Sequence, residues 1–368
     1  MNKSDKIVFL KEVHFMRNVG TVVRGIRAPI VKEGDDLERI VVDSVLKVAE
    51  SDNIIFKDKD IVSITESLVA RAQGNYVTID HIAKDIQEKF NGEVGVVFPI
   101  FSRNRFSLIL KGIARGAKKV YLLLNTEIDE VGNPIVNPFT NIDIVKYYKE
   151  LSNNIEIILS DDPTEILKYT KNVLVADIHK RKKTKEKIKN AGCNTIYSLD
   201  EIVNKSIDGS GYNEDYGLLG SNYSTDEQLK LFPRDGQIFV NKIRDELKNK
   251  TGKNIEVMIY GDGAFKDPVA GIWEFADPVV SPAYTEGLAG TPNELKLKFL
   301  ADDKSLTKEE LMRKIKEKDI TAKEALGTTP RRLTDLIGSL CDLTSGSGDK
   351  GTPIILIQGY FDNYSAEE

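Results

Sequence analysis

The sequence has few of the residues that build disulfides and zinc sites. Among its 368 residues are two cysteines and three histidines. The cysteines, Cys193 and Cys341, are far apart and lack the spacing of metal ligands, and the histidines do not cluster. These scarcities argue against a disulfide framework and against a histidine-based zinc site. We therefore expect a reduced, cytoplasmic setting in which both cysteines are small buried residues.

Long hydrophobic runs are absent as well. No run of about 18 consecutive apolar residues occurs anywhere in the chain. The first 20 residues are too polar for a secretory signal peptide. The sequence therefore gives no reason to expect a membrane partner.

Net positive charge is also lacking. Charged residues make up 30% of the chain, and the formal net charge is −5. Binding to a phosphate backbone favours a basic surface, so nucleic acid is not an expected partner. The P-loop signature G-x-x-x-x-G-K-[ST] is missing too. The length and the 40% hydrophobic content fit about two soluble domains.

One stretch combines a buried strand with a polar turn. Residues 255–260 are β-branched and apolar, which predicts a strand, and residues 261–263 read Gly-Asp-Gly. The glycines leave bare backbone on both sides of the Asp262 carboxylate, which suits a hard divalent cation beside a phosphate. Lys266 and Asp267 follow closely. The alternative is a tight turn that binds no ligand.

A second polar junction lies near the N-terminus. Residues 59–66 are predicted to form a strand and residues 67–74 a short helix. Thr65 and Glu66 then stand where the strand becomes the helix. Free backbone amides at such junctions bind anions, although most junctions hold only a capping residue. Thr65 and Glu66 are therefore candidate ligand-binding residues.

A helix predicted at 328–343 has a polar face. Asp335, Ser339 and Asp342 recur at i, i+4 and i+7, so all three lie on one side. Such a stripe is usually solvated, but it could also face a metal-phosphate site.

The stretch 207–223 is rich in glycine and has no periodicity. Its glycines, acidic residues and Ser/Asn groups could wrap a ligand with backbone. An ordinary linker is the alternative.

Near the N-terminus, Asp35 and Asp36 are expected in the cap and first turn of a helix.

From about residue 94 the pattern alternates between strand and helix for about 110 residues, and the expected elements include a strand at 119–124 and a helix at 163–169. This alternation predicts a parallel, doubly wound layer, in which ligands lie at the carboxyl ends of the strands. The polar residues expected at those ends are Ser102, Arg103, Asn104, Arg105, Asp129, Glu130, Asn133, Asp177 and His179.

Four segments, taken in order, resemble the gamma-glutamyl ligases of deazaflavin-coenzyme (factor-420) biosynthesis. They are 24–37, with Arg-Gly-Ile and Gly-Asp-Asp-Leu; 60–74; 231–262, from Leu-Phe-Pro-Arg-Asp to Gly-Asp; and 335–359, with Gly-Thr-Pro-Ile-Ile-Leu-Ile-Gln-Gly. Together these segments make up about a quarter of the chain and are spread from residue 24 to residue 359.

The resemblance implies an α+β ligase-like body of mixed sheets and helices. Residues 1–98 and 206–368 would form the two parts of this body. Residues 99–205 have no counterpart in the family, so we expect them to form an inserted α/β doubly wound layer. A homodimer is also expected.

The resemblance further implies a ligase that uses GTP or ATP with Mg²⁺ or Mn²⁺ to join glutamate to a small-molecule carboxylate acceptor. The residues expected to act are Asp262 and Lys266 in catalysis, and Asp262, Asp215 and Asp267 as metal ligands. The residues expected to bind the nucleotide are Arg24, Pro29, Thr65, Glu66, Ser221, Asn222 and Ser339.

The sequence departs from the family at two places. The family continues after its metal-binding Asp with Thr and a Gly-Arg-Pro-Trp-Arg run, whereas here only Asp262 and one following cation are kept. Leu219 stands where the family loop Gly-Ile-Asp-x-Ser-Asn has its Asp, so the second acid would be Asp208, Glu214, Asp215 or Asp267. A non-catalytic nucleotide- or metabolite-binding protein on the same fold is therefore the alternative function.

Overall fold

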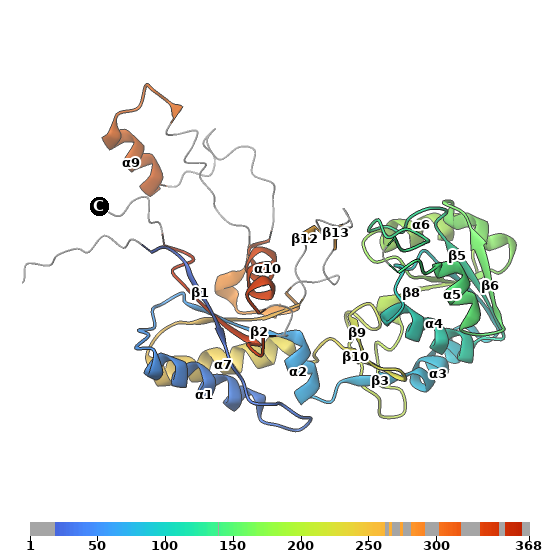
Figure 1. Ribbon diagram of the computed structural model, residues 1–368, viewed down its shortest axis with the longest axis horizontal. Helices are drawn as coiled ribbons and strands as arrows, with labels where there is room; N and C mark the ends of the chain where they lie inside the picture. The colour runs from blue at the N-terminus through green and yellow to red at the C-terminus, as the bar shows by residue number, and fades with distance from the viewer. Residues whose placement is uncertain are drawn as a thin grey trace, which may run out of the picture.

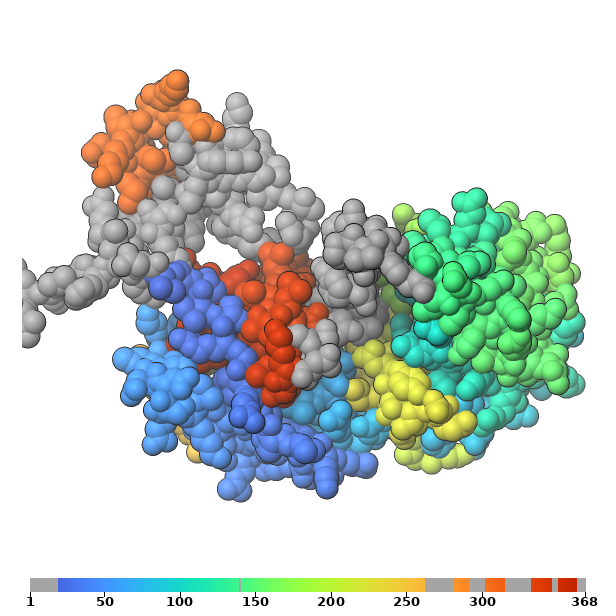
Figure 2. Space-filling model, in the orientation of Figure 1, coloured from blue at the N-terminus to red at the C-terminus, as the bar shows by residue number. Residues whose placement is uncertain are grey.

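The computed structural model describes most of the chain in two bodies. The described residues are 19–138, 140–261, 265–266, 273–274, 281–290, 302–317, 332–345 and 350–362. Figure 1 shows one body that contains both the blue N-terminal segment and the red C-terminal helix, and a second body formed by the green middle of the chain. The space-filling view in Figure 2 shows the same green segment gathered in a lobe of its own.

The first body is built on a mixed five-stranded sheet. Its strands, in pairing order, are β1 (Val22–Ile26), β15 (Ile354–Gln358), β2 (Ile61–Thr65), β11 (Glu256–Tyr260) and β14 (Ala283–Tyr284). β2 and β11 run parallel, and Tyr260 stands opposite Thr65. β15 is antiparallel to both β1 and β2, so β1 points the same way as β2. The carboxyl ends of β1, β2 and β11 therefore lie at one edge of the sheet.

Helices cover both faces of this sheet. α1 (Leu37–Ser51) and α7 (Gly236–Thr251) share a core with one face, which includes Val62. α10 (Leu333–Ser345) shares a second core with the other face, which includes Ile61. Because successive side chains of a strand point to opposite faces, both sets of apolar residues in β2 are buried. Figure 1 shows α10 on the side of the sheet opposite α1 and α7.

The second body holds a parallel sheet. Its strands pair in the order β6 (Ile155–Leu159), β5 (Lys119–Leu124), β4 (Glu93–Val97), β7 (Asn172–Val175) and β8 (Thr195–Ser198), and every pair is parallel. One face packs on α3 (Ile79–Phe90), α4 (Arg105–Gly116) and α5 (Ile144–Glu150), and the other on the 3₁₀ helix η1 (Pro163–Lys168) and α6 (Arg181–Asn190). Parallel neighbours require such crossover connections, which explains why both faces are covered.

A small antiparallel sheet lies where the two bodies meet (Figure 1). It pairs β3 (Tyr76–Thr78), β10 (Gln228–Leu231) and β9 (Ser221–Thr225). α2 (Glu66–Ala72), which follows β2 directly, packs against β10, and α4 packs against both β9 and β10. The remaining described elements are η2 (Leu199–Glu201), β12 (Phe265–Lys266), β13 (Trp273–Glu274), η3 (Glu286–Leu288) and α9 (Lys308–Glu317).

Several local predictions from the sequence are confirmed. The strand expected at 119–124 coincides with β5. The first-turn acid Asp36 caps α1, because its carboxylate accepts from the amide of Arg39 at 3.1 Å. The segment expected to be helical at 163–169 forms a 3₁₀ helix, η1, that begins at Pro163. Proline at the first helical position suits a helix start because its missing N–H would have no partner there.

The coarse expectation of a mixed α/β protein with several sheets is confirmed. The finer expectation, that residues 99–205 form an inserted doubly wound layer, stays a prediction. β4 and α3 precede residue 99, and both contribute side chains to the core of the parallel-sheet body.

Glycine at one position allows α3 and α4 to pack directly on each other. A Cβ atom built on Gly116 would lie 2.2 Å from the backbone oxygen of Ala83. One turn earlier, a Cβ atom on Gly112 would lie 2.6 Å from Cγ2 of Ile82. The two helices therefore meet through a surface that tolerates no added methyl group at Gly116.

We expect Gly116→Ala to destabilise the protein. Overpacking of this kind costs about 1–3 kcal/mol, and here it outweighs the better helix propensity of alanine. Urea or thermal unfolding of the variant and the wild type measures the difference. Glu88→Ala on the exposed side of α3 is the control, and it should change the free energy of unfolding by less than about 0.5 kcal/mol. Equal stability of Gly116→Ala and wild type would contradict the close approach.

Candidate functional site at the shared strand edge

The carboxyl end of β2 places two of the predicted residues at the shared strand edge. Thr65 ends β2 in an extended conformation, and its amide donates to the Pro353 carbonyl at 3.0 Å. Glu66 begins α2 and is only 3% exposed. An acid in the first turn of a helix is favoured electrostatically. Since α2 has seven residues, its dipole is small, and the Glu66 carboxylate is the main feature of the junction.

The β9–β10 hairpin covers this junction. Asn222 Nδ2 donates to Glu66 Oε1 at 2.9 Å, which joins residues 156 positions apart. Lys230 stands opposite Asn222 in the register of the hairpin, and its Nζ donates to the hydroxyl of Ser67. The structure therefore brings Thr65, Glu66 and Asn222 together, as the sequence predicts for a common site, and adds Lys230.

Lys230 is the residue of this group that sequence reasoning missed. It is 9% exposed and is flanked by Leu229 and Leu231, which are both buried. Lysine is almost never fully buried unless it is paired. In the sequence, a lysine between two leucines of a strand is the pattern of a solvent-facing position, so no local signal indicated that Lys230 would be buried.

Ser221, predicted with Asn222 to bind the nucleotide, faces the other way. Neighbouring residues of a strand point to opposite faces. Ser221 is fully buried, donates to the Leu218 carbonyl at 2.7 Å and accepts from Arg105 Nε at 3.3 Å. In this structure Ser221 supports the loop before β9, while Asn222 points to Glu66.

Arg24 and Pro29, expected on the nucleotide side, do not lie together. The Arg24 guanidinium donates to Gln358 Oε1 at 2.9 Å, and Gln358 in turn donates to Asp60 Oδ2 at 2.8 Å. Asp60 precedes β2, so Arg24 reaches toward the edge opposite Thr65. Pro29 is exposed and follows the carboxyl end of β1.

The polar face predicted on the C-terminal helix is engaged in local contacts. The Ser339 hydroxyl donates to the Asp335 carbonyl at 2.8 Å within α10. The Asp335 carboxylate forms two hydrogen bonds with the Arg332 guanidinium, at 2.7 and 2.9 Å. Asp342 is 4% exposed. The hydroxyl of Ser339 is thus engaged within its own helix.

The predicted metal ligands are mostly beyond what the structure describes. Asp262, Asp267 and the side chain of Lys266 lie outside the described residues. Asp215 is described and exposed on the glycine-rich loop. No group of three or more His, Cys, Asp or Glu side chains suited to a metal ion occurs among the residues that the structure describes. Along the chain, Asp262 follows Tyr260, the partner of Thr65, by two residues.

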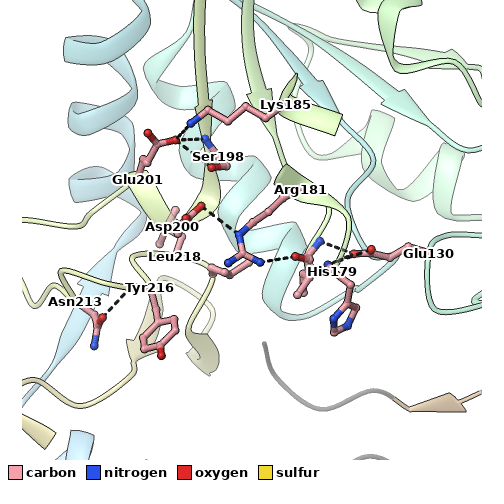
Figure 3. Close-up of polar contacts among 12 residues, drawn as sticks. Glu130, His179, Arg181, Lys185, Ser198, Asp200, Glu201, Asn213, Tyr216 and Leu218 are labelled. Atoms are coloured by element: carbon pink, nitrogen blue, oxygen red, sulfur yellow. Dashed lines mark hydrogen bonds and ion pairs between the residues drawn. The ribbon is translucent and has the colours of Figure 1, made fainter. Parts of the chain in front are cut away.

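The glycine-rich loop is an ordered element rather than a loose linker. Asn75 is fully buried and exchanges hydrogen bonds of 3.0 Å with both the amide and the carbonyl of Tyr212. The Asn213 carbonyl oxygen Oδ1 accepts from the amide of Tyr216 at 2.9 Å, as Figure 3 shows. The two amide side chains hold the loop between the two bodies.

Tyr216 is a second residue that sequence reasoning missed. Burial raises the pKa of its hydroxyl, while Arg332 and Arg181 are close enough for their charges to oppose that rise. Arg332 belongs to the first body and Arg181 to the second. The charges of both arginines therefore act on Tyr216, although Arg332 pairs with Asp335 and Arg181 with Asp200.

Two carboxylates at the carboxyl edge of the parallel sheet accept hydrogen bonds from backbone amides of the loops at that edge. The Asp129 carboxylate accepts from the amides of Phe101, Val131 and Asn133 at 2.8–3.0 Å. Glu130 accepts from the amide of His179, as Figure 3 shows. Asp129 and Glu130, both expected to bind a ligand, thus stabilise the loops through hydrogen bonds with backbone amides.

Asp177, on the loop after β7, is buried at the same edge and is 2% exposed. One carboxylate oxygen accepts from the Thr184 hydroxyl at 2.7 Å. The other oxygen has no hydrogen-bond partner among the described residues. Burial raises the pKa of Asp177 from 3.8 to about 6, with the negative charge of Glu130 adding to the rise.

We expect Asp177→Asn to stabilise the protein at neutral pH. Between about pH 4 and pH 6 the folded state binds more protons at this group than the unfolded state, so the free energy of unfolding falls as pH rises. Asparagine cannot ionise, so the variant avoids the stability that the wild type loses when Asp177 becomes charged. This gain in unfolding free energy is on the order of 2 kcal/mol at pH 8 and vanishes below pH 4. Unfolding at pH 4 and pH 8 measures both values.

Asp161→Asn is the control for this experiment. Hydrogen bonds from Thr126 lower the pKa of Asp161, so the ionised form stabilises the fold. Its replacement should therefore reduce stability at pH 8, the opposite sign. A destabilised Asp177→Asn variant at pH 8 would show that the buried carboxylate is needed in its charged form.

Comparison with known proteins identifies the class of the chain. The family model described as F420-0:Gamma-glutamyl ligase matches residues 25–359, nearly the whole chain. The chain therefore belongs to the F420-0:gamma-glutamyl ligase family, which is a family of ligases. Among curated proteins, none matches the chain significantly. In the part of the chain that the structure describes, no helix has both the length and the apolar character needed to cross a membrane.

Proposed function

We propose that the protein is a nucleotide- and divalent-metal-dependent ligase that joins L-glutamate to a carboxylate acceptor through an amide bond. One observation carries the proposal beyond family membership. The buried Glu66 carboxylate, held by Asn222, stands at the edge where β2 and β11 end side by side. In sheets with parallel strands, ligands bind at the carboxyl ends of the strands.

The residues at this edge suit a divalent cation with a nucleotide. Mg²⁺ and Mn²⁺ prefer carboxylate and carbonyl oxygens. Glu66 offers one carboxylate here, and along the sequence Asp262 comes two residues after Tyr260, the partner of Thr65. The cation, when bound, would neutralise phosphate charge. Asn222 would orient the Glu66 carboxylate, and the Lys230 ammonium beside Ser67 would add positive charge.

The proposed overall reaction has two stages. The acceptor carboxylate takes the terminal phosphoryl group of GTP or ATP, which gives an acyl phosphate and the nucleoside diphosphate. The amine of glutamate then attacks the acyl carbon, the C–N bond forms, the C–O bond to phosphate breaks, and a proton leaves the nitrogen. Products are the amide, the nucleoside diphosphate and inorganic phosphate. The cytoplasm, which supplies these nucleotides, is the compartment that we propose.

The test is an assay of nucleotide turnover. Purified protein is incubated with GTP or ATP, Mg²⁺ or Mn²⁺, glutamate and a panel of small carboxylic acids, and released phosphate is measured. Phosphate release that requires both glutamate and one acceptor supports the proposal, and mass spectrometry of the product identifies the amide. Neither turnover nor nucleotide binding with any of the metals would overturn it.

We expect Glu66→Gln to weaken metal-dependent nucleotide binding at least tenfold. The amide keeps an oxygen that can accept from Asn222, so the fold is preserved while the charge that would face the cation is lost. Calorimetric titration with Mg²⁺–nucleotide measures the change, and thermal unfolding checks stability. Glu286→Gln on the exposed helix η3 is the matched control and should bind as the wild type does. Unchanged affinity in Glu66→Gln would remove this carboxylate from the site.

A non-catalytic nucleotide- or metabolite-binding protein is the second candidate function. Leu219 favours it, because this side chain is fully buried in the apolar core where the family loop has an acid. The same titration and turnover assay separate the two functions. Binding of nucleotide without turnover of any acceptor would favour the second.

A further inference from the structure

The side chain of Arg105 reaches from α4 to the loop that precedes β9, whose Leu218 and Leu219 lie in the core of the parallel-sheet body. Arg105 is the first residue of α4 and is half-buried. Its guanidinium donates to the carbonyls of Leu218, at 3.2 Å, and Leu219, and to the hydroxyl of Ser221 at 3.3 Å. The sequence placed this arginine among the polar residues expected at a ligand-binding strand end, and the structure shows it donating to three acceptors of one loop.

These contacts fix one face of the hairpin whose other face meets Glu66. Ser221 and Asn222 are adjacent in β9, so their side chains point to opposite faces. Ser221 faces Arg105 on α4, and Asn222 faces Glu66 on α2. Lys230, opposite Asn222 in register, also reaches α2 through Ser67. The hairpin is therefore held between α4 and α2 by polar contacts on both faces.

The planar guanidinium is well suited to this role. Its donors form a rigid fork, so it can hold several acceptors in a set arrangement, whereas an ammonium group is a point charge on a flexible stem. Leu218 and Leu219 are both fully buried, so water cannot readily replace the donors that their carbonyls would lose. Loss of the guanidinium should loosen the loop and change the direction of Asn222.

We propose that Arg105 is a positioning residue for the site at Glu66. By anchoring the loop 218–221 from the parallel-sheet body, it sets the direction in which Asn222 presents its amide to the Glu66 carboxylate. The inference rests on the proposed function, since it assigns Arg105 a role in metal-nucleotide binding at that site. The guanidinium of Arg105 thereby influences the site through the loop, without contacting the nucleotide.

The test compares Arg105→Gln and Arg105→Lys with Arg103→Gln. Arg103 is exposed, two residues away, and its side chain makes no hydrogen bond or ion pair among the described residues, so it is the matched control. We expect Arg105→Gln to speed amide hydrogen exchange at 218–222 and to weaken Mg²⁺–nucleotide binding about tenfold. Arg105→Lys should fall between Arg105→Gln and the wild type, and Arg103→Gln should match the wild type. Thermal unfolding verifies that each variant is folded.

A double-mutant cycle with Asn222→Ala separates positioning from general stability. If Arg105 acts through Asn222, the double variant binds nucleotide no more weakly than Asn222→Ala alone. Losses of affinity that add fully, or unchanged exchange at 218–222 in Arg105→Gln, would overturn the inference while leaving the ligase proposal intact. A wild-type protein that neither binds nor turns over nucleotide would overturn the proposed function and this role with it.

Discussion

The parallel pairing of β2 with β11 is the constraint on which the rest of the structure depends. Both strands are apolar on both faces, so each can exist only between two layers of helices. Their register sets Tyr260 opposite Thr65, and the chain therefore leaves both strands at the same edge. Glu66, which directly follows Thr65, takes its place at this edge from the pairing.

The β9–β10 hairpin determines which side chain faces Glu66 at that edge. Alternation along β9 assigns Ser221 to the parallel-sheet body and Asn222 to the ligase-like body. A shift of one residue in the strand would exchange these two side chains and separate Asn222 from Glu66. The anchoring of the loop before β9 therefore has consequences at Glu66, although no residue of the parallel-sheet body touches Glu66 through a described hydrogen bond.

Much of the fold follows from sequence patterns, because periodicity and caps are local signals. β5, the cap of α1 and the junction at Thr65 and Glu66 are all read from neighbouring residues. The pairing of Asn222 with Glu66 spans 156 positions, and that of Arg105 with Ser221 spans 116. Such contacts depend on how the hairpin lies against α2 and α4, which no local pattern encodes. The sequence thus singled out Glu66, Ser221 and Asn222 as candidates without predicting that Ser221 and Asn222 would face opposite ways.

The two strand edges of the protein also show why a polar residue after a strand does not by itself indicate a ligand. At the parallel-sheet edge, the Asp129 and Glu130 carboxylates accept from backbone amides of buried loops, whose donors must be satisfied in any folded state. At the other edge, Glu66 Oε1 accepts from the side-chain amide of Asn222. A backbone amide committed to a turn cannot be released without unfolding the turn, whereas a side-chain amide can rotate and keep its own hydrogen bonds elsewhere. The Glu66 edge therefore has the chemistry of a site whose contacts can change when a ligand binds.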